Sequence, residues 1–205
     1  MFKSQRGNSI IEVMVVIIIL TIGITGAYNI IGNGQKLSST AENRIKAINI
    51  AREGLEAVEN IRDTNWIKFS SDYNNCWKVK NYDTTCIGNS GKEYASGSYI
   101  LVQSGVLWTL SGIILPNVTY ATYVGQFPIF LNTNSLPTSS GNNVICSSTK
   151  TSDCKTIFTR ELQISHPDND HMKVNSIVSW VDSSQTNGPH SINLETILTN
   201  WKKQF

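Results

Sequence analysis

The chain of 205 residues is long enough for one modest hydrophobic core, and 40% of its residues are hydrophobic while only 16% are charged. Its 17 basic and 15 acidic side chains give a formal charge of +2, which supplies no long-range field to concentrate nucleic acid. We therefore do not expect nucleic acid as a general partner. The apolar residues are dense near the N-terminus, and a part rich in Ser, Thr and Asn follows. This imbalance indicates that the chain meets two different environments.

The first expected element is an uncharged stretch behind a short basic segment. Lys3 and Arg6 precede it, and the 19 residues from Val13 to Ile31 carry no charge. That length matches the roughly 20 residues that a helix needs to cross a bilayer. The positive-inside bias orients the N-terminus toward the cytoplasm. The sequence therefore predicts a single-pass precursor in the cytoplasmic membrane with its C-terminal part outside.

Two simpler interpretations fit the same pattern. A secretory signal peptide would have Thr25 to Ala27 as its small-residue cleavage site, but the apolar run continues to Ile31. A permanent single-span anchor explains the length and the charges equally well, but it gives no role to Glu12. A carboxylate inside an apolar run is costly in lipid and usually has a partner.

Glu12 gains a partner if the chain is cut after Gly7. Hydrolysis there creates an α-amino group on Asn8, and Glu12 follows four residues later, one helical turn away. An acidic residue in a first turn also offsets the helix dipole, but by only a few tenths of a kcal/mol, roughly. That is too little to balance its burial, so we expect the chain to be cleaved after Gly7.

The stretch from Lys3 to Leu20, KSQRGNSIIEVMVVIIIL, resembles the class III leader of type IV pilins and type II secretion pseudopilins. In that family a basic leader ends in Gly, a membrane aspartyl peptidase cuts after it, and the fifth mature residue is Glu. Gly7 and Glu12 occupy those positions. Asn8 stands where the family usually has Phe, which leaves open whether the same peptidase also methylates the new N-terminus.

The resemblance implies a structural subunit, major or minor, of a type IV pilus, assembled into an extracellular filament for adhesion, motility or DNA uptake. It implies other pilin subunits, the prepilin peptidase and an inner-membrane assembly platform as partners. A type II secretion pseudopilin has the same precursor chemistry and stays an alternative. An alternative of another class is a membrane-anchored extracytoplasmic domain that does not polymerise.

We do not expect an enzyme or a cofactor. The sequence contains no nucleophile elbow, phosphate-binding glycine loop or metal-binding helix motif. The stretch His166-Pro-Asp-Asn-Asp-His171 gathers two histidines and two carboxylates, but between two strands it is more typical of a hairpin turn than of a metal site. The five tryptophans fit a core or an interface, with a sugar-binding platform as the alternative.

Behind the uncharged stretch the helical pattern continues in amphipathic form. Apolar residues recur in steps of three, four and seven, at Leu37, Ala41, Ile45, Ile48, Leu55, Val58 and Ile61. We expect the helix to end at Asp63-Thr64-Asn65. From about Ser9 to Thr64 it would be about 85 Å long, longer than any bilayer, so its outer half must pack on something else.

Glycines interrupt this helix at Gly23, Gly26, Gly32 and Gly34, each at a cost of up to about 1 kcal/mol relative to Ala. By the resemblance, we expect the helix to melt locally at Gly32 to Gly34 in a filament. Close packing of helices through small residues is the alternative interpretation.

The expected partner of the outer half is a sheet. Segments rich in β-formers are Tyr99 to Val102, Val106 to Leu110, Val118 to Val124, Lys155 to Ser165, Met172 to Val181 and Ser191 to Trp201. The predicted fold class is α+β, with a long N-terminal helix packed on a C-terminal antiparallel β-sheet, as in the pilin fold. The expected domains are a leader (1–7), a transmembrane or filament-core helix (8–34), an amphipathic helix (35–66) and a globular sheet domain (67–205).

Four cysteines lie in the last part, at Cys76, Cys86, Cys146 and Cys154. An even count behind an export-type segment favours disulfides. Of three connectivities, the short separations favour Cys76 with Cys86 and Cys146 with Cys154. Each bond would staple a loop and stabilise it by roughly 2 to 3 kcal/mol. A zinc site would prefer C-x-x-C spacing, which the sequence lacks.

Overall fold

The computed structural model describes residues 8–104, 106–113, 127–131, 137–138, 154–181 and 189–202. The chain divides into two compact units, Met1–Asn43 and Arg44–Phe205. The described residues of the first unit, 8–43, are helical. The second contains the last part of the same helix together with a sheet and a loop region, which confirms the predicted α+β class.

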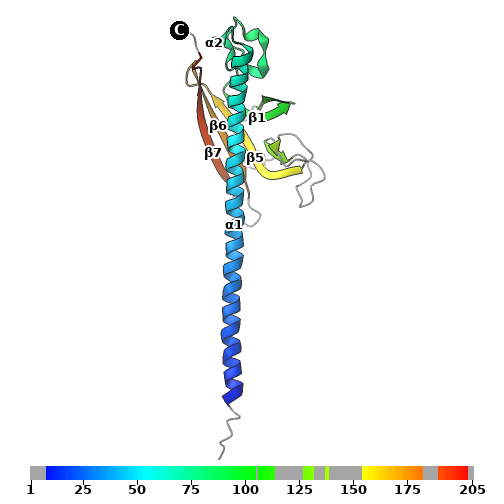
Figure 1. Cartoon of the computed structure of the whole chain (residues 1–205), viewed down its shortest axis with the longest axis vertical. Coiled ribbons are helices and arrows are strands. Elements are labelled where there is room, and N and C mark those ends of the chain that lie inside the picture. The colour runs from blue at the N-terminus through cyan, green and yellow to red at the C-terminus, as the bar shows by residue number, and fades with distance from the viewer. Residues whose placement is uncertain are drawn as a thin grey trace, which may run out of the picture. The chain divides into compact units, whose positions relative to one another are not determined.

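The N-terminal helix α1 spans Asn8–Lys68 (Figure 1). It remains helical through Gly32 and Gly34, and local melting there stays a prediction for an assembled filament. The predicted stop at residues 63–65 is wrong, because α1 continues to Lys68. The reason is tertiary: Asn65 is fully buried, and its side-chain amide donates to the carbonyls of Trp77 and Val79. These contacts override the weak helix propensity of an Asn.

The described residues form a seven-stranded sheet in which every paired neighbour is antiparallel. Five of the six predicted strands are present within a few residues of their expected bounds, while Val118 to Val124 lies outside the described residues. Two further short strands, Pro128–Leu131 and Pro137–Thr138, lie where no strand was predicted. The strands are β1 (Gly97–Ser104), β2 (Leu107–Ile113), β3 (Pro128–Leu131), β4 (Pro137–Thr138), β5 (Cys154–Ser165), β6 (His171–Trp180) and β7 (His190–Thr199).

Strand β5 is the centre of the sheet. One of its edges pairs with β6, and the other is shared by β1 near Leu162 and by β3 near Cys154. Its middle is buried at consecutive positions, from Phe158 to Leu162, so the strand is covered on both faces there. Strand β6, by contrast, alternates strictly between buried and partly exposed residues, as a strand with one core face should.

In the second unit, the last part of α1 packs on the core face of this sheet (Figure 1). Small residues allow the close approach: Ala47 and Ala51 are fully buried against a cluster that includes Val178 and Trp180. Gly54 comes closest, because a Cβ atom on it would lie 2.7 Å from Oγ of Ser176. A side chain at this position would force Ser176 and Leu162 to move.

A buried ion pair fixes the helix next to this crossing. Arg160 of β5 is 3% exposed, and its Nη1 lies 3.4 Å from Oε2 of Glu53 and donates to the carbonyl of Ile50 at 3.1 Å. Burial raises the pKa of Glu53 despite the nearby guanidinium, and burial lowers the pKa of Arg160 despite the nearby carboxylate. Desolvation therefore outweighs the attraction for both partners, and the pair serves geometry more than stability.

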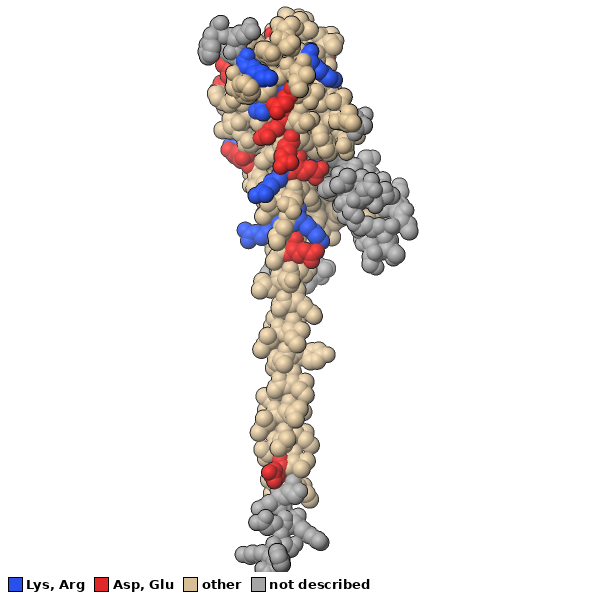
Figure 2. All heavy atoms as spheres, viewed as in Figure 1, with Lys and Arg blue, Asp and Glu red and all other residues tan. Residues whose placement is uncertain are grey.

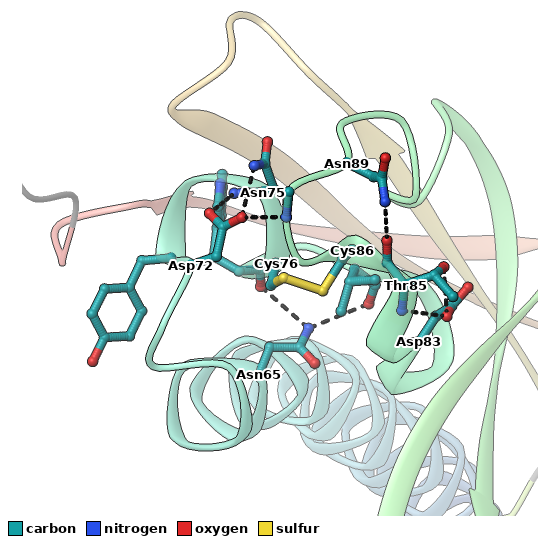
Figure 3. The surroundings of a disulfide bond; sticks show 12 residues. Asn65, Asp72, Asn75, Cys76, Asp83, Thr85, Cys86 and Asn89 are labelled. Atoms are coloured by element: carbon teal, nitrogen blue, oxygen red, sulfur yellow. Dashed lines mark hydrogen bonds between the residues drawn. A yellow bond between two sulfur atoms is a disulfide. The ribbon is translucent and has the colours of Figure 1, made fainter.

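A compact loop region follows α1 and contains the short helices α2 (Tyr73–Cys76), η1 (Lys80–Tyr82) and η2 (Thr84–Cys86). Cys76 and Cys86 form a disulfide, one of the two local pairs favoured by the spacing, and both are fully buried (Figure 3). The carboxylate of Asp72 accepts hydrogen bonds from the backbone of Gly88 and of Asn75. These bonds, that from Gly88 foremost, lower the pKa of Asp72.

The other predicted pair falls partly outside the described residues, because Cys146 is not described. Cys154 is buried at the start of β5 and carries no free thiol. The residues between His166 and His171 form the turn between β5 and β6, as predicted. In this turn Nδ1 of His171 lies 2.7 Å from Oδ1 of Asp168.

Gly54→Ala should destabilise the second unit although Ala is the better helix former. The added methyl overpacks the crossing against Ser176, at a cost of about 1 to 3 kcal/mol that exceeds the helix gain of about 1 kcal/mol. Urea unfolding of the full chain in detergent, followed by tryptophan fluorescence, measures this loss.

The double variant Gly54→Ala/Ser176→Ala should recover part of the loss, because it removes the Oγ atom at 2.7 Å but leaves Cδ2 of Leu162 at 3.0 Å. The removed Oγ is a buried atom with no hydrogen-bond partner in the described structure. Gly34→Ala is the matched control, since a Cβ atom there meets nothing within 4 Å. Equal stability of Gly54→Ala and wild type would show that the crossing is looser than described.

Replacing Cys76 and Cys86 together by Ser should destabilise the loop region by roughly 2 to 3 kcal/mol, because the unfolded loop regains its freedom. Peptide mapping without reductant should first show the link between Cys76 and Cys86. It should also show a link between Cys146 and Cys154. A cross-pair such as Cys86 with Cys154 would contradict both assignments.

Candidate functional site

The first unit presents a continuous apolar surface. Every large apolar side chain from Ile10 to Ile31 is between 48% and 78% exposed. These side chains follow one another without a polar face, so no rotation of the helix could hide them in a single contact. Among the described residues, α1 is the helix that is long and apolar enough to cross a membrane. Such a surface needs lipid or other helices around it.

The two threonine hydroxyls of this stretch form hydrogen bonds within the helix. The hydroxyl of Thr21 donates to the carbonyl of Ile18 at 2.8 Å, and that of Thr25 donates to the carbonyl of Thr21 at 2.7 Å. Hydroxyls bonded in this way expose no unpaired donor to hydrocarbon. The threonines are therefore compatible with an apolar environment on all sides.

Glu12 is the exception. It is the single charged residue between Arg6 and Lys36, it is exposed, and it forms no ion pair with any residue that the structure describes. Helix α1 begins at Asn8, so Asn8 and Glu12 lie one turn apart on the same helix, although the side chain of Asn8 is not described. Gly7 lies outside the described residues. An ionised carboxylate in this apolar surface therefore requires a cation from elsewhere.

The four glycines of the first unit have no neighbour that requires them. A Cβ atom at Gly23, Gly26, Gly32 or Gly34 would meet nothing within 4 Å. This contrasts with Gly54, whose close contacts in the second unit explain it. Each glycine leaves a shallow gap in the apolar surface, of the kind through which helices approach one another in membranes.

Charged side chains gather on the second unit, whereas the first is almost uncharged on the face that Figure 2 shows. In the parts of the chain that are described, no three His, Cys, Asp or Glu side chains come close enough to hold a metal ion. From Ile10 to Ile31 the first unit therefore presents an apolar surface with one acidic residue, Glu12.

The apolar surface was predicted from the sequence because it is a local feature, and the role of Glu12 stays a prediction. Sequence reasoning missed the close crossing at Gly54 and the buried Arg160. A glycine at the end of an alanine-containing helical stripe was a weak signal for the first. Nothing in the strand pattern around Arg160 distinguishes it from a solvent-exposed arginine.

A comparison with known protein families supports the resemblance of the N-terminal segment to a class III prepilin leader. The family model described as the prokaryotic N-terminal methylation motif matches residues 2–28. The matched range contains the basic leader, Gly7, Asn8, Glu12 and most of the uncharged stretch. No curated protein and no solved structure matches the chain significantly. The chain thus carries a class III prepilin leader, consistent with a precursor of the type IV pilin and pseudopilin family.

Proposed function

We propose that the chain is a structural subunit of a type IV pilus, held in the cytoplasmic membrane as a precursor, cleaved after Gly7 and assembled into an extracellular filament. The observation that carries the proposal is the methylation motif at residues 2–28, continued by an apolar helix surface that the chain itself leaves uncovered. Lipid covers this surface before assembly, and helices of other subunits cover it afterwards.

In this mechanism the apolar side chains supply attraction and Glu12 supplies register. Cleavage gives Asn8 an α-ammonium group, which enters the same apolar surroundings as the carboxylate. Within one helix the two groups meet only imperfectly across a first turn. The ammonium group of a neighbouring subunit offers Glu12 a better partner, and pairing removes two uncompensated charges from a medium of low dielectric constant.

The proposed boundaries are residues 1–7 for the leader, 8–34 for the filament core, 35–66 for the amphipathic helix and 67–205 for the outer domain. The role is that of a building unit and not of an enzyme. The partners are other pilin subunits, the prepilin peptidase and the assembly platform. A type II secretion pseudopilin uses the same leader and assembly chemistry and is the second candidate for this reason.

Gly7→Val should block cleavage, because the peptidase accepts only the smallest residue before the scissile bond. The protein should stay in the membrane with Lys3 and Arg6 attached, and intact-mass measurement should show the uncut chain. Ser4→Val, which adds similar bulk elsewhere in the leader, should still yield a chain that begins at Asn8. Extracellular filaments of normal subunit mass from Gly7→Val would refute the processing step.

Glu12→Gln should leave cleavage, insertion and the second unit intact but reduce filaments by at least tenfold. Gln keeps the shape and loses the charge, and an unpaired ammonium group in the apolar core costs several kcal/mol, roughly. Electron microscopy of sheared surface material measures the filaments.

Glu59→Gln is the control, since it removes an acidic group of α1 in the second unit. Abundant normal filaments built solely from the Glu12→Gln chain would contradict the pairing. Sparse incorporation of the Glu12→Gln chain into filaments of another pilin would identify a minor subunit.

A further inference from the structure

The loop region of the second unit contains an open groove of about 490 Å³ that neither the leader nor the helix explains. Its lining residues are all charged, polar or glycine: Lys80, Asn81, Asp83, Gly91, Lys92 and Glu93. The volume falls in the range of small-molecule sites, but none of the hydrophobic residues that usually line such sites is present. The groove therefore suits a hydrophilic ligand.

Backbone contacts hold the two walls of the groove together. The first wall contains Lys80, and its backbone amide donates to the carbonyl of Lys92 in the second wall at 2.9 Å. Next to this bond, Val79 forms a β-bridge with Glu93. The disulfide between Cys76 and Cys86 closes the segment that carries the first wall. The groove is thus formed by a stapled loop whose shape is set before any ligand arrives.

The first wall contains strained backbone. Asn81 and Tyr82 have φ values of 51° and 56°, in the left-handed region, which a bulky aromatic residue rarely adopts. The hydroxyl of Tyr82 donates to the carbonyl of Trp108 at 2.6 Å and that of Tyr94 accepts from the amide of Asn81 at 3.3 Å. Strain that the surroundings enforce in this way is typical of ligand sites.

The charges of the groove do not cancel. The Glu93 carboxylate lies 2.7 Å from Nζ of Lys78, which is buried beside it, so it is already neutralised. The Asp83 carboxylate accepts from the backbone amide and hydroxyl of Thr85 through Oδ1. Lys80 and Lys92 are exposed and form no ion pair with any described residue, although Lys92 lies near enough to Asp83 to affect it electrostatically.

We propose that this groove is a binding site for an anionic, hydroxyl-rich ligand, an acidic oligosaccharide or a polyol phosphate. Lys80 and Lys92 pair with its carboxylate or phosphate groups. The side-chain NH2 of Asn81 donates to its hydroxyls, and Oδ2 of Asp83, for which the described residues provide no donor, accepts from them. All lining residues of the groove belong to the second unit, so the binding test does not depend on Glu12 or on cleavage after Gly7.

Calorimetric titration of the full chain, purified in a zwitterionic detergent, tests the proposal. The probes are a trigalacturonate, a glycerol phosphate trimer, inorganic phosphate and the neutral trisaccharide maltotriose. The chain should bind at least one anionic trimer, at low salt, at least tenfold more tightly than maltotriose or inorganic phosphate. The tighter of the two trimers then distinguishes a carboxylate ligand from a phosphate ligand.

Lys80→Gln/Lys92→Gln should weaken that binding at least tenfold, and so should Asn81→Asp, which keeps a residue that tolerates left-handed backbone but adds a negative charge. Lys36→Gln/Lys155→Gln is the control: it removes two positive charges outside the groove and should bind the trimer as tightly as the wild type does. An unchanged thermal unfolding curve shows that each variant is folded. Equal loss in the control pair, binding of inorganic phosphate as tight as that of both trimers, or no binding by either trimer would overturn the proposal.

Discussion

The apolar surface of α1 between Ile10 and Ile31 cannot be buried by the chain that carries it, and this constraint governs everything else in the first unit. A helix that is apolar on all sides is stable only in lipid or among other helices. The threonine hydroxyls turn back to the helix backbone, and a single carboxylate is left to be paired. These features fit surroundings of lipid or of other apolar helices.

In the second unit the same helix is covered by the chain itself. Here α1 has a sheet to pack on, and the contact is made through alanines and Gly54 so that helix and β5 come close together. Burying Arg160 and Glu53 at this contact gains little free energy, since desolvation dominates both of their pKa shifts. What the pair provides is a fixed axial position of β5 on α1, because a slipped helix would leave the guanidinium buried without a carboxylate.

The loop closed by the disulfide between Cys76 and Cys86 packs next to the helix and the sheet of the second unit. It is anchored to α1 through the buried Asn65 (Figure 3). The hydroxyl of Tyr82 anchors it to β2. A loop held at so many points can keep left-handed backbone at Asn81 and Tyr82 and can present two lysines that have no ion-pair partner in the described structure. The proposed anion site therefore depends on the staple, whereas the proposed filament depends on the first unit.

The sequence by itself determined the membrane-type stretch, the leader with Gly7 and Glu12, the amphipathic stripe and most of the strands. All of these are patterns over a few to about twenty neighbouring residues, which composition and periodicity report directly. The whole candidate assembly surface could be predicted for this reason.

Only the tertiary structure decided that α1 continues to Lys68, that β5 is the central strand, and that Gly54, Arg160 and the groove at Lys80 matter. Each of these depends on residues far apart in the chain, such as Asn65 with Val79 or Glu53 with Arg160. Local propensity carries no information about such contacts. The prediction from propensity therefore ended the helix at residues 63–65, although Asn65 is bonded to the carbonyls of Trp77 and Val79.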